Sequence, residues 1–229
     1  MLTMGRWEPN ASGRLLQAAI ELFSEAGYEA TTAAQIAERA GLTKTTLFRH
    51  FTDKREILFQ GQEPLVALAV EGVESAGPGS TPFQALRAGV LALCAGHAGQ
   101  QRETCRQLDA ILSSSAELRE RAVFKRSAIT QALHQALAAR LGDARQAAVL
   151  ADLGVRAYYD GFASWIAAGD DRCLTDAVSG ELDAYQAMLV SVTWPPPDAP
   201  TSGRTAERSG TGSRRDGARS PDGGVSPPQ

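Results

Sequence analysis

The spacing of hydrophobic residues predicts two helices near the start of the chain. Over residues 11–26, apolar side chains recur every three or four positions, which is the period of an amphipathic helix. This helix is expected to end at Gly27, because glycine readily adopts the conformations that terminate helices. A second helix is predicted to begin after Thr32, since Thr32 and Gln35 have the spacing of a capping box.

A third, short helix is predicted within the segment LTKTTLFRHF, residues 42–51. Gly41 allows a sharp turn before it, Thr43 can cap it, and Leu47 can anchor it against the second helix. Two short helices joined by a few residues that include a glycine form the helix-turn-helix arrangement. In this third helix, the outward positions carry side chains that can donate hydrogen bonds to bases or phosphates: Lys44, Thr45, Arg49 and His50.

The pattern after residue 52 predicts a fourth helix and then a larger helical region. Asp53 and Glu56 repeat the capping-box spacing and are expected to open a helix that runs to about residue 76. Pro64 is expected to kink or interrupt this helix, because proline removes an internal hydrogen bond and clashes with the preceding turn. Further helices are predicted at residues 83–97, 100–114, 116–141, 145–168 and 173–191. The sequence therefore predicts an all-α fold of about nine helices.

Three parts of the chain differ in composition. Residues 1–58 contain the predicted helix-turn-helix unit, and residues 59–194 contain a larger helical domain. A three-helix unit buries little surface by itself, so the fourth helix is expected to brace it against the larger domain. Residues 195–229 hold seven of the eleven prolines and no aromatic residue, which predicts a disordered and dispensable tail.

Charge is distributed unevenly along the chain. The formal net charge is -3, yet residues 39–55 contain five basic residues and one acidic residue. A local basic segment in an otherwise acidic protein suits an anionic partner such as DNA. No uninterrupted apolar run is longer than residues 65–70, which are too few to cross a membrane, and the N-terminus lacks the apolar core of a secretory signal. We therefore expect a cytoplasmic protein with no membrane span.

No motif typical of nucleotide binding, hydrolase catalysis or zinc peptidases occurs, and the three histidines lie far apart in the sequence. We therefore expect no enzyme activity and no cofactor. Cys94 and His97 have the spacing to share a helix face, and a metal site that includes Cys105 is one alternative. The alternative that we favour is a packed thiol and a hydrogen-bonded histidine, with no metal.

Residues 14–58, from RLLQAAIELF to HFTDKREIL, resemble the DNA-binding domain of the TetR family of bacterial regulators. The resemblance combines the Gly27-Tyr28 stop, the Thr31-Thr32 start and the IAERAGLTKTTLF core. The residues that follow resemble the variable helical ligand-binding and dimerisation domain of that family, and more weakly its mycofactocin-regulator type. One position departs from the family pattern. Phe48 stands where the family usually has a tyrosine whose hydroxyl contacts a DNA phosphate.

The resemblance implies a homodimeric repressor that binds a palindromic, double-stranded DNA operator and is released by a small-molecule effector. Each subunit would place its third helix in a major groove, where Lys44 and Thr45 would read bases. The resemblance implies further contacts to phosphates, or to both phosphates and bases, from Thr32, Thr43, Thr46, Phe48, Arg49, His50 and Lys54. The last two helices would form the dimer seam, with contacts from Trp165, Val178, Leu182 and Tyr185.

An interior rich in alanine, leucine and aromatic residues suits an apolar or acyl effector. The candidate effector contacts are Leu93, Leu108, Leu112, Phe124, Tyr158 and Phe162. Alternatives stay open, because the aromatic residues near Tyr158 could fill the core or cover the dimer seam. Three polar residues could contact an effector or be solvated or paired: Asp109, His134 and Asp160. The competing hypothesis from another class is a helical small-molecule binding protein or enzyme that does not bind DNA.

Overall fold

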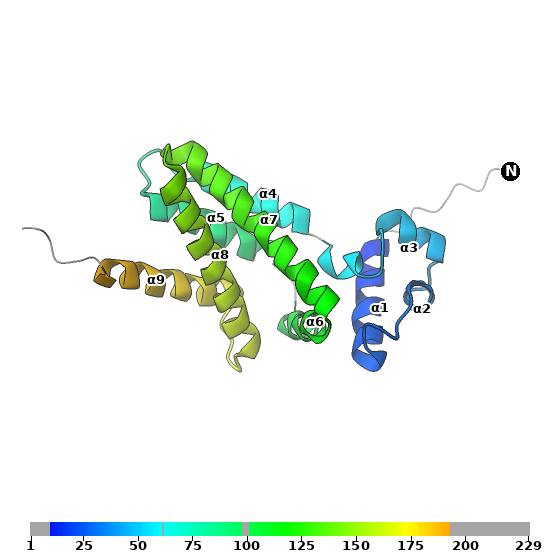
Figure 1. Ribbon diagram of the computed structural model, residues 1–229. Helices are drawn as coiled ribbons and strands as arrows, with labels where there is room; N and C mark the ends of the chain where they lie inside the picture. Colours follow the sequence, from blue (N-terminus) through cyan, green and yellow to red (C-terminus); the bar gives the residue numbers. More distant parts are fainter. Residues whose placement is uncertain (1–9, 61, 98–100, 193–229) are drawn as a thin grey trace, which may run out of the picture. The chain divides into compact units, whose positions relative to one another are not determined.

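The computed structural model describes residues 10–60, 62–97 and 101–192 (Figure 1). Within these residues it contains nine α-helices and one short 3-10 helix, and no strand. The predicted all-α fold is therefore confirmed. The predicted tail, residues 195–229, lies outside the described residues.

The first three helices are α1 (Ala11–Ala26), α2 (Ala33–Arg39) and α3 (Lys44–His50). They begin and end within a few residues of the predicted positions. Gly27 follows α1, and its backbone N–H donates to the carbonyl of Phe23 at 3.0 Å. The N-terminal part of the chain therefore has the predicted order of helices and turns.

Local hydrogen bonds explain where α2 and α3 begin. Thr32 and Gln35 form the predicted capping box, with the Thr32 N–H donating to Gln35 Oε1 at 2.8 Å and the Gln35 N–H to Thr32 Oγ1 at 3.3 Å. Thr43 caps α3 by accepting from the Thr46 N–H at 3.1 Å. Between the two helices, Gly41 has a φ of 66°, a conformation that disfavours side chains larger than hydrogen. The helix-turn-helix is thus built from contacts within a few residues.

The hydrophobic core of the N-terminal helices includes residues from outside them. Leu15, Ile36 and Leu47 are fully buried in this core, from α1, α2 and α3 respectively. Two side chains of the larger helical region join the same cluster: Ile111 from α6 (Arg102–Ser114) and Leu118 from α7 (Ala116–Leu141). The N-terminal helices therefore pack against α6 and α7 as well as against the predicted fourth helix, which contributes Ile57 and Leu58 to this core.

The predicted fourth helix is divided into two elements. A 3-10 helix (Glu56–Phe59) comes first, and α4 (Gln62–Ser75) follows. Asp53 accepts the N–H of Glu56 at 3.0 Å, so half of the predicted capping box is present. Pro64 lies in the first turn of α4, where its missing N–H removes no internal hydrogen bond. The predicted interruption is confirmed, and the break comes just before the proline.

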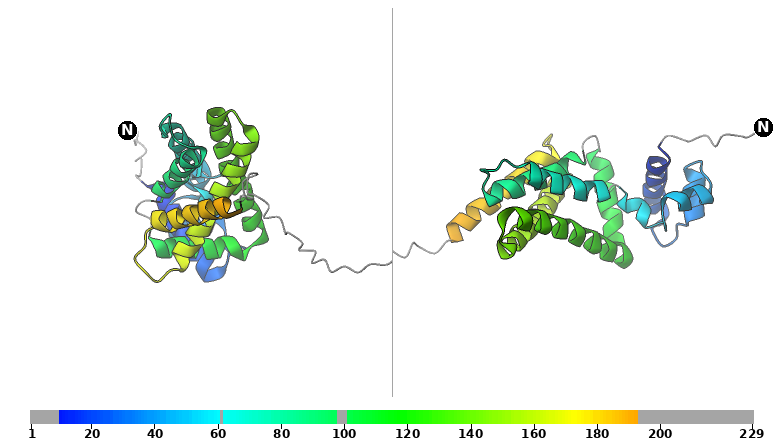
Figure 2. Two further views of the ribbon diagram at one scale, coloured as in Figure 1. Left: turned by 90° about the vertical axis from the view of Figure 1, so that its left-hand side faces the viewer. Right: turned by 90° about the horizontal axis from the view of Figure 1, so that it is seen from above.

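The remaining helices lie within two residues of their predicted bounds. They are α5 (Pro82–Ala95), α6 (Arg102–Ser114), α7 (Ala116–Leu141), α8 (Ala144–Ala167) and α9 (Leu174–Val192). α4 packs against α5, α7 against α8, and α9 against α8 and α5, as the views in Figures 1 and 2 show. None of the helices in the described part of the chain combines the length and apolar character that a membrane crossing requires.

α8 and α9 meet at very short range. A Cβ atom added at Gly161 of α8 would lie 2.7 Å from the Cα of Val178 on α9, which is closer than atoms of this type approach. The absence of a side chain at Gly161 therefore permits this helix contact. Val178 and Leu182, both fully buried, point from α9 into the core of the larger helical region.

Candidate nucleic-acid interface

One face of α3 projects away from the core. Leu47 is fully buried, whereas Lys44, Thr45, Phe48 and Arg49 are exposed and line one shallow surface hollow. With 3.6 residues per turn, these four positions share the side of the helix that Leu47 leaves free. We call these four residues the α3 outer face. Four of the predicted DNA contacts therefore lie together.

Two of the threonines predicted to contact DNA are helix caps. Thr32 and Thr43 hold the first turns of α2 and α3, and Thr46 Oγ1 lies 2.9 Å from Thr43 Oγ1. Thr32 and Thr43 are exposed, Thr46 is half-buried, and His50 is exposed at the last position of α3. Thr43, Thr46 and His50 adjoin the residues of the α3 outer face along the chain, whereas Thr32 lies at the start of α2.

Lys54 has an internal role that the sequence analysis missed. Its Nζ donates to the backbone carbonyls of Tyr28 at 2.6 Å and Thr31 at 2.9 Å. The same ammonium lies 4.1 Å from the centroid of the Tyr28 ring, within the range of a cation–π contact. Lys54 therefore ties the segment after α3 to the loop between α1 and α2. No local pattern signals this contact, because its partners lie 23 and 26 residues away.

Only part of the basic segment is available to an anionic partner. Arg39 pairs with Glu21 at 3.3 Å and with Glu25 at 2.9 Å, and the hydrogen bond from Arg39 holds the pKa of Glu25 below its ordinary value. In the described part of the chain, no carboxylate lies within ion-pair distance of Lys44 or Arg49. The positive charge therefore concentrates on the α3 outer face.

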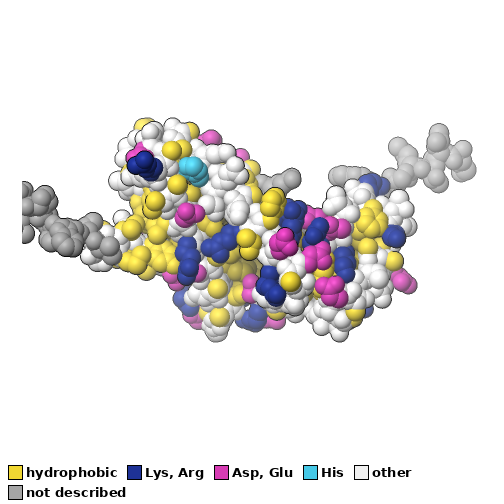
Figure 3. Space-filling model, in the orientation of Figure 1, with side chains coloured by type: hydrophobic (Ala, Val, Ile, Leu, Met, Phe, Trp, Pro, Cys, Tyr) yellow, Lys and Arg dark blue, Asp and Glu magenta, His cyan; other side chains and the backbone are white. Residues whose placement is uncertain are grey.

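A cluster of ion pairs connects the segment after α3 to α7. Glu56 accepts from Arg121 Nε at 2.6 Å and lies 3.6 Å from Lys125 Nζ. The hydrogen bond from Arg121 holds the pKa of Glu56 below its ordinary value. Arg55 bridges Asp53 at 2.8 Å and a carboxylate of α7 at 3.0 Å. Figure 3 shows acidic and basic side chains interleaved in this region.

Comparison with known proteins agrees with the geometry of the N-terminal helices. Residues 15–60 match the family described as bacterial regulatory proteins, tetR family. The N-terminal domain belongs to the TetR family. The matched segment contains the α3 outer face and ends just after the 3-10 helix.

Two curated relatives share this TetR domain. The HTH-type transcriptional activator FasR of Mycolicibacterium smegmatis is 41% identical over 81 residues, which are 35% of this chain and 37% of FasR. The HTH-type transcriptional regulator TcmR of Streptomyces glaucescens is 36% identical over 73 residues, 32% of each chain. Both matches therefore span about a third of the relative's length.

A solved structure extends the likeness to the larger helical region. SmeT, the repressor of a multidrug efflux pump of Stenotrophomonas maltophilia, has been solved in complex with triclosan. That complex superposes with a TM-score of 0.56 at 20% identity, over 78% of this chain and 90% of SmeT. At this identity the likeness establishes the fold.

The predicted effector contacts in the core of the larger region form an aromatic group around His97. Its Nε2 lies 2.6 Å from the Tyr158 hydroxyl, and its ring centroid lies 5.7 Å from that of Phe162. Burial raises the pKa of Tyr158 well above its ordinary value, so the hydroxyl stays neutral. Leu93 is fully buried in the same core. Leu93, Tyr158 and Phe162 therefore share one cluster, in which they pack against the core.

The other three effector candidates lie elsewhere. Leu108 and Leu112 of α6 are partly buried and pack against the core of the TetR domain. Phe124 of α7 is 63% exposed, and the guanidinium of Arg121 lies 5.1 Å from its ring centroid. The six candidates thus divide between two hydrophobic clusters and the surface of α7. Sequence reasoning could not separate them, because all are apolar residues at helical spacing.

Cys94 and His97 have separate partners. The Cys94 thiol donates to the Val90 carbonyl at 3.7 Å, and burial raises the pKa of this thiol to about 12. Among the described residues, no group of three His, Cys, Asp or Glu side chains is arranged to hold a metal ion. The two residues are thus the packed thiol and the hydrogen-bonded histidine that the sequence analysis favoured.

The four predicted dimer contacts differ in how far they are buried. Val178 and Leu182 are fully buried, and Trp165 is 7% exposed with its Nε1 donating to the Arg172 carbonyl at 3.1 Å. Other parts of the same chain therefore cover Val178 and Leu182 completely and leave little of Trp165 exposed. Tyr185 is partly exposed, and its hydroxyl donates to Asp160 at 2.5 Å.

Other apolar side chains are exposed on the last two helices. They are Met188, Leu189 and Val190 of α9 and Val149 of α8. Figure 3 shows hydrophobic side chains gathered over α9. None of these four residues is among the predicted dimer contacts.

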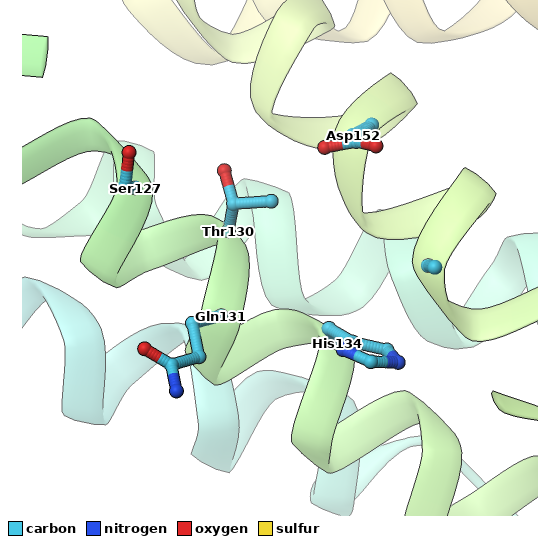
Figure 4. A pocket seen from close by; sticks show the side chains of 6 residues that line it. Ser127, Thr130, Gln131, His134 and Asp152 are labelled. Atoms are coloured by element: carbon cyan, nitrogen blue, oxygen red, sulfur yellow. The ribbon is translucent and has the colours of Figure 1, made fainter.

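A polar hollow of about 470 Å³ lies between α7 and α8 (Figure 4). His134 lines it, with Nε2 at 3.2 Å from the Ala144 carbonyl, and Asp152 faces it from α8. Ser127, Thr130 and Gln131 supply further polar groups from α7. None of the six apolar effector candidates lines this hollow.

Proposed function

We propose that the protein is a transcriptional regulator that binds a double-stranded DNA operator through α3. The observation that carries this proposal is the α3 outer face within a TetR-family domain. Its exposed lysine and arginine have no carboxylate partner among the described residues, while Leu47 anchors the helix from behind. A short basic helix held in this way fits the major groove and complements its negative potential.

We assign different roles to the DNA contacts. Lys44 and Thr45 read base edges, while Arg49 and His50 contact phosphates, or both phosphates and bases. Hydrogen bonds to phosphate position the protein, whereas contacts to base edges provide sequence specificity. Lys54 has one remaining N–H for a phosphate, since two of its three are donated to carbonyl groups.

The protein is proposed to act as a homodimer on a palindromic operator, with α8 and α9 at the seam. The exposed side chains of Met188, Leu189 and Val190 on α9 support this arrangement. Burial of such apolar side chains by a second subunit would stabilise the dimer. Two reading helices on one dimer would then match two half-sites.

An apolar or acyl effector is proposed to release the regulator from DNA, with α6 as the coupling element. At its start, Arg102 donates to the carbonyls of Ala168, Asp170 and Arg172 between α8 and α9. Towards its end, Leu112 packs against the core of the TetR domain. A ligand can shift this arrangement only through different affinities for the two states.

Binding to DNA selected from a random pool by the full-length chain tests the proposed function. The affinity for the selected duplex is expected to fall with salt at a log-log slope of about -4 to -8, because each neutralised phosphate contributes about -0.9. Arg49→Ala is expected to weaken binding, whereas Arg145→Ala, which removes the same charge from an exposed position on α8, is not. Equal affinities of both variants and the wild type would contradict the assignment of α3. Failure to enrich any duplex would favour a helical protein that does not bind DNA.

A further inference from the structure

Phe48 is an exposed aromatic residue in the centre of the α3 outer face. It is 46% exposed, although the aromatic residue at the end of the same helix, Phe51, is 9% exposed and belongs to the core. About half of the Phe48 side chain is therefore left uncovered by its own domain. An apolar ring in this position needs an apolar partner to be covered favourably.

The geometry of the helix sets the neighbours of this ring. Phe48 follows Lys44 by four residues and Thr45 by three, so its side chain lies beside both on the helix surface. The Lys44 ammonium is 5.7 Å from the centroid of the Phe48 ring, and both residues line the same hollow together with Arg49. The ring is thus an apolar group flanked by side chains that donate hydrogen bonds.

The chemistry of the major groove offers one matching group. The edges of adenine, guanine and cytosine present hydrogen-bond donors and acceptors there, whereas thymine also presents its C5 methyl. Phe48 has neither a donor nor an acceptor on its side chain, so it cannot hydrogen-bond to a phosphate. The favourable occupant of this apolar position is a methyl group in the groove.

We propose that Phe48 contacts the C5 methyl of a thymine in each operator half-site and so contributes to sequence specificity. This inference rests on the proposed function, because it requires α3 to enter the major groove. Lys44 and Thr45 then hydrogen-bond to the bases beside this thymine, while Phe48 excludes water from its methyl. Phe48 selects thymine over cytosine at this position.

Replacing single thymines by deoxyuridine tests the contact directly, since this replacement removes the methyl and keeps the base pair. The probe is a duplex that the full-length chain selects from a random pool. One thymine in each half-site is expected to be sensitive, with affinity falling about fourfold, the value for one buried methyl group. With both half-sites substituted, the loss is expected to be about sixteenfold.

Variants of the protein assign the effect to its source. Phe48→Ala is expected to bind the thymine and uracil duplexes equally, while Arg49→Ala binds both more weakly and keeps their ratio. The matched control is Val123→Ala, an apolar residue of α7 that is 64% exposed, which is expected to keep the wild-type affinity and ratio. Thermal melts of the three variants check that each is folded.

The outcomes separate this inference from the proposed function. Specific binding with no thymine sensitive to loss of its methyl would overturn the role of Phe48 and leave DNA binding by α3 intact. A sensitivity that persists in Phe48→Ala would assign the methyl contact to another residue and equally overturn it. If the pool yields no enriched duplex, the proposed function fails, and this inference fails with it.

Discussion

α3 and α9 both carry residues for which the sequence predicted contacts with another molecule. The four residues of the α3 outer face are exposed, whereas two of the predicted contacts on α9 are fully buried. On α3, Leu47 is fully buried while Phe48 is 46% exposed. On α9, the predicted contacts Val178 and Leu182 are fully buried, and exposed apolar residues such as Val190 lie beyond them.

The difference arises from how many faces of each helix are apolar. α3 has one buried side chain and a cap at Thr43, so its orientation follows from local sequence. α9 carries apolar residues around much of its circumference and packs against both α5 and α8. For such a helix, only the packing of distant segments selects the inward face.

The largest expected effect distinguishes the buried from the exposed residues of α9. Leu182→Arg places an unpaired charge in the core and is expected to lower the free energy of unfolding by several kcal/mol, roughly 3 or more. Leu189→Arg, at a position 40% exposed, is expected to yield folded monomers. Thermal melts and sedimentation measure the two effects. A folded monomer for Leu182→Arg would return this residue to the seam.

The next prediction compares two lysines of the basic segment. Lys54→Ala removes two hydrogen bonds to carbonyls and is expected to destabilise the protein by about 1.5 to 3 kcal/mol. Lys44→Ala is expected to leave stability unchanged and to weaken operator binding by about 1 to 3 kcal/mol more than binding to random DNA. Denaturant unfolding and DNA titrations well below the melting temperature check both. Unchanged stability for Lys54→Ala would assign that lysine to phosphate contact.

A smaller effect is expected from the connection between Glu56 and α7. Because hydrogen bonding to Arg121 holds the pKa of Glu56 below its ordinary value in the folded protein, this pair stabilises the fold above the unfolded pKa. The pair contributes about 1 kcal/mol to the free energy of unfolding. This contribution begins to be lost as the pH falls below about 4.5, the unfolded pKa, and is fully lost once the pH is below the lowered pKa of the folded state. The free energy of unfolding is therefore expected to fall less steeply with decreasing pH in Glu56→Gln than in the wild type. Identical pH profiles would show that the pair contributes nothing.

The smallest expected effect concerns the departure from the family pattern. Phe48→Tyr keeps the ring and adds a hydroxyl, which is expected to tighten binding by about 0.5 to 1.5 kcal/mol if it reaches a phosphate. The gain should be equal for operator and random DNA, because a phosphate contact reads no base. Stability should hardly change, since the side chain is 46% exposed. DNA titrations at one salt concentration measure the two affinities. Unchanged or weaker affinity of Phe48→Tyr would place the ring away from the backbone of the duplex.

The exposure of the α3 outer face could be predicted because the positions of its residues depend on local contacts. The capping box of Thr32 and Gln35, the turn at Gly41 and the cap at Thr43 each involve groups within four residues. Together with one buried leucine, they determine which side of α3 faces outward. The candidate effector contacts lacked such constraints, and these candidates divide between the core, α6 and the surface of α7.

The sequence by itself determined the helices and their ends, because periodicity and capping are properties of neighbouring residues. Tertiary structure decided which apolar faces are covered and which charges are paired. Lys54 reaches carbonyls 23 and 26 residues away, and Arg121 reaches Glu56 across 65 residues. Such contacts form only when helices pack, since each partner could equally face water until packing brings the two side chains together.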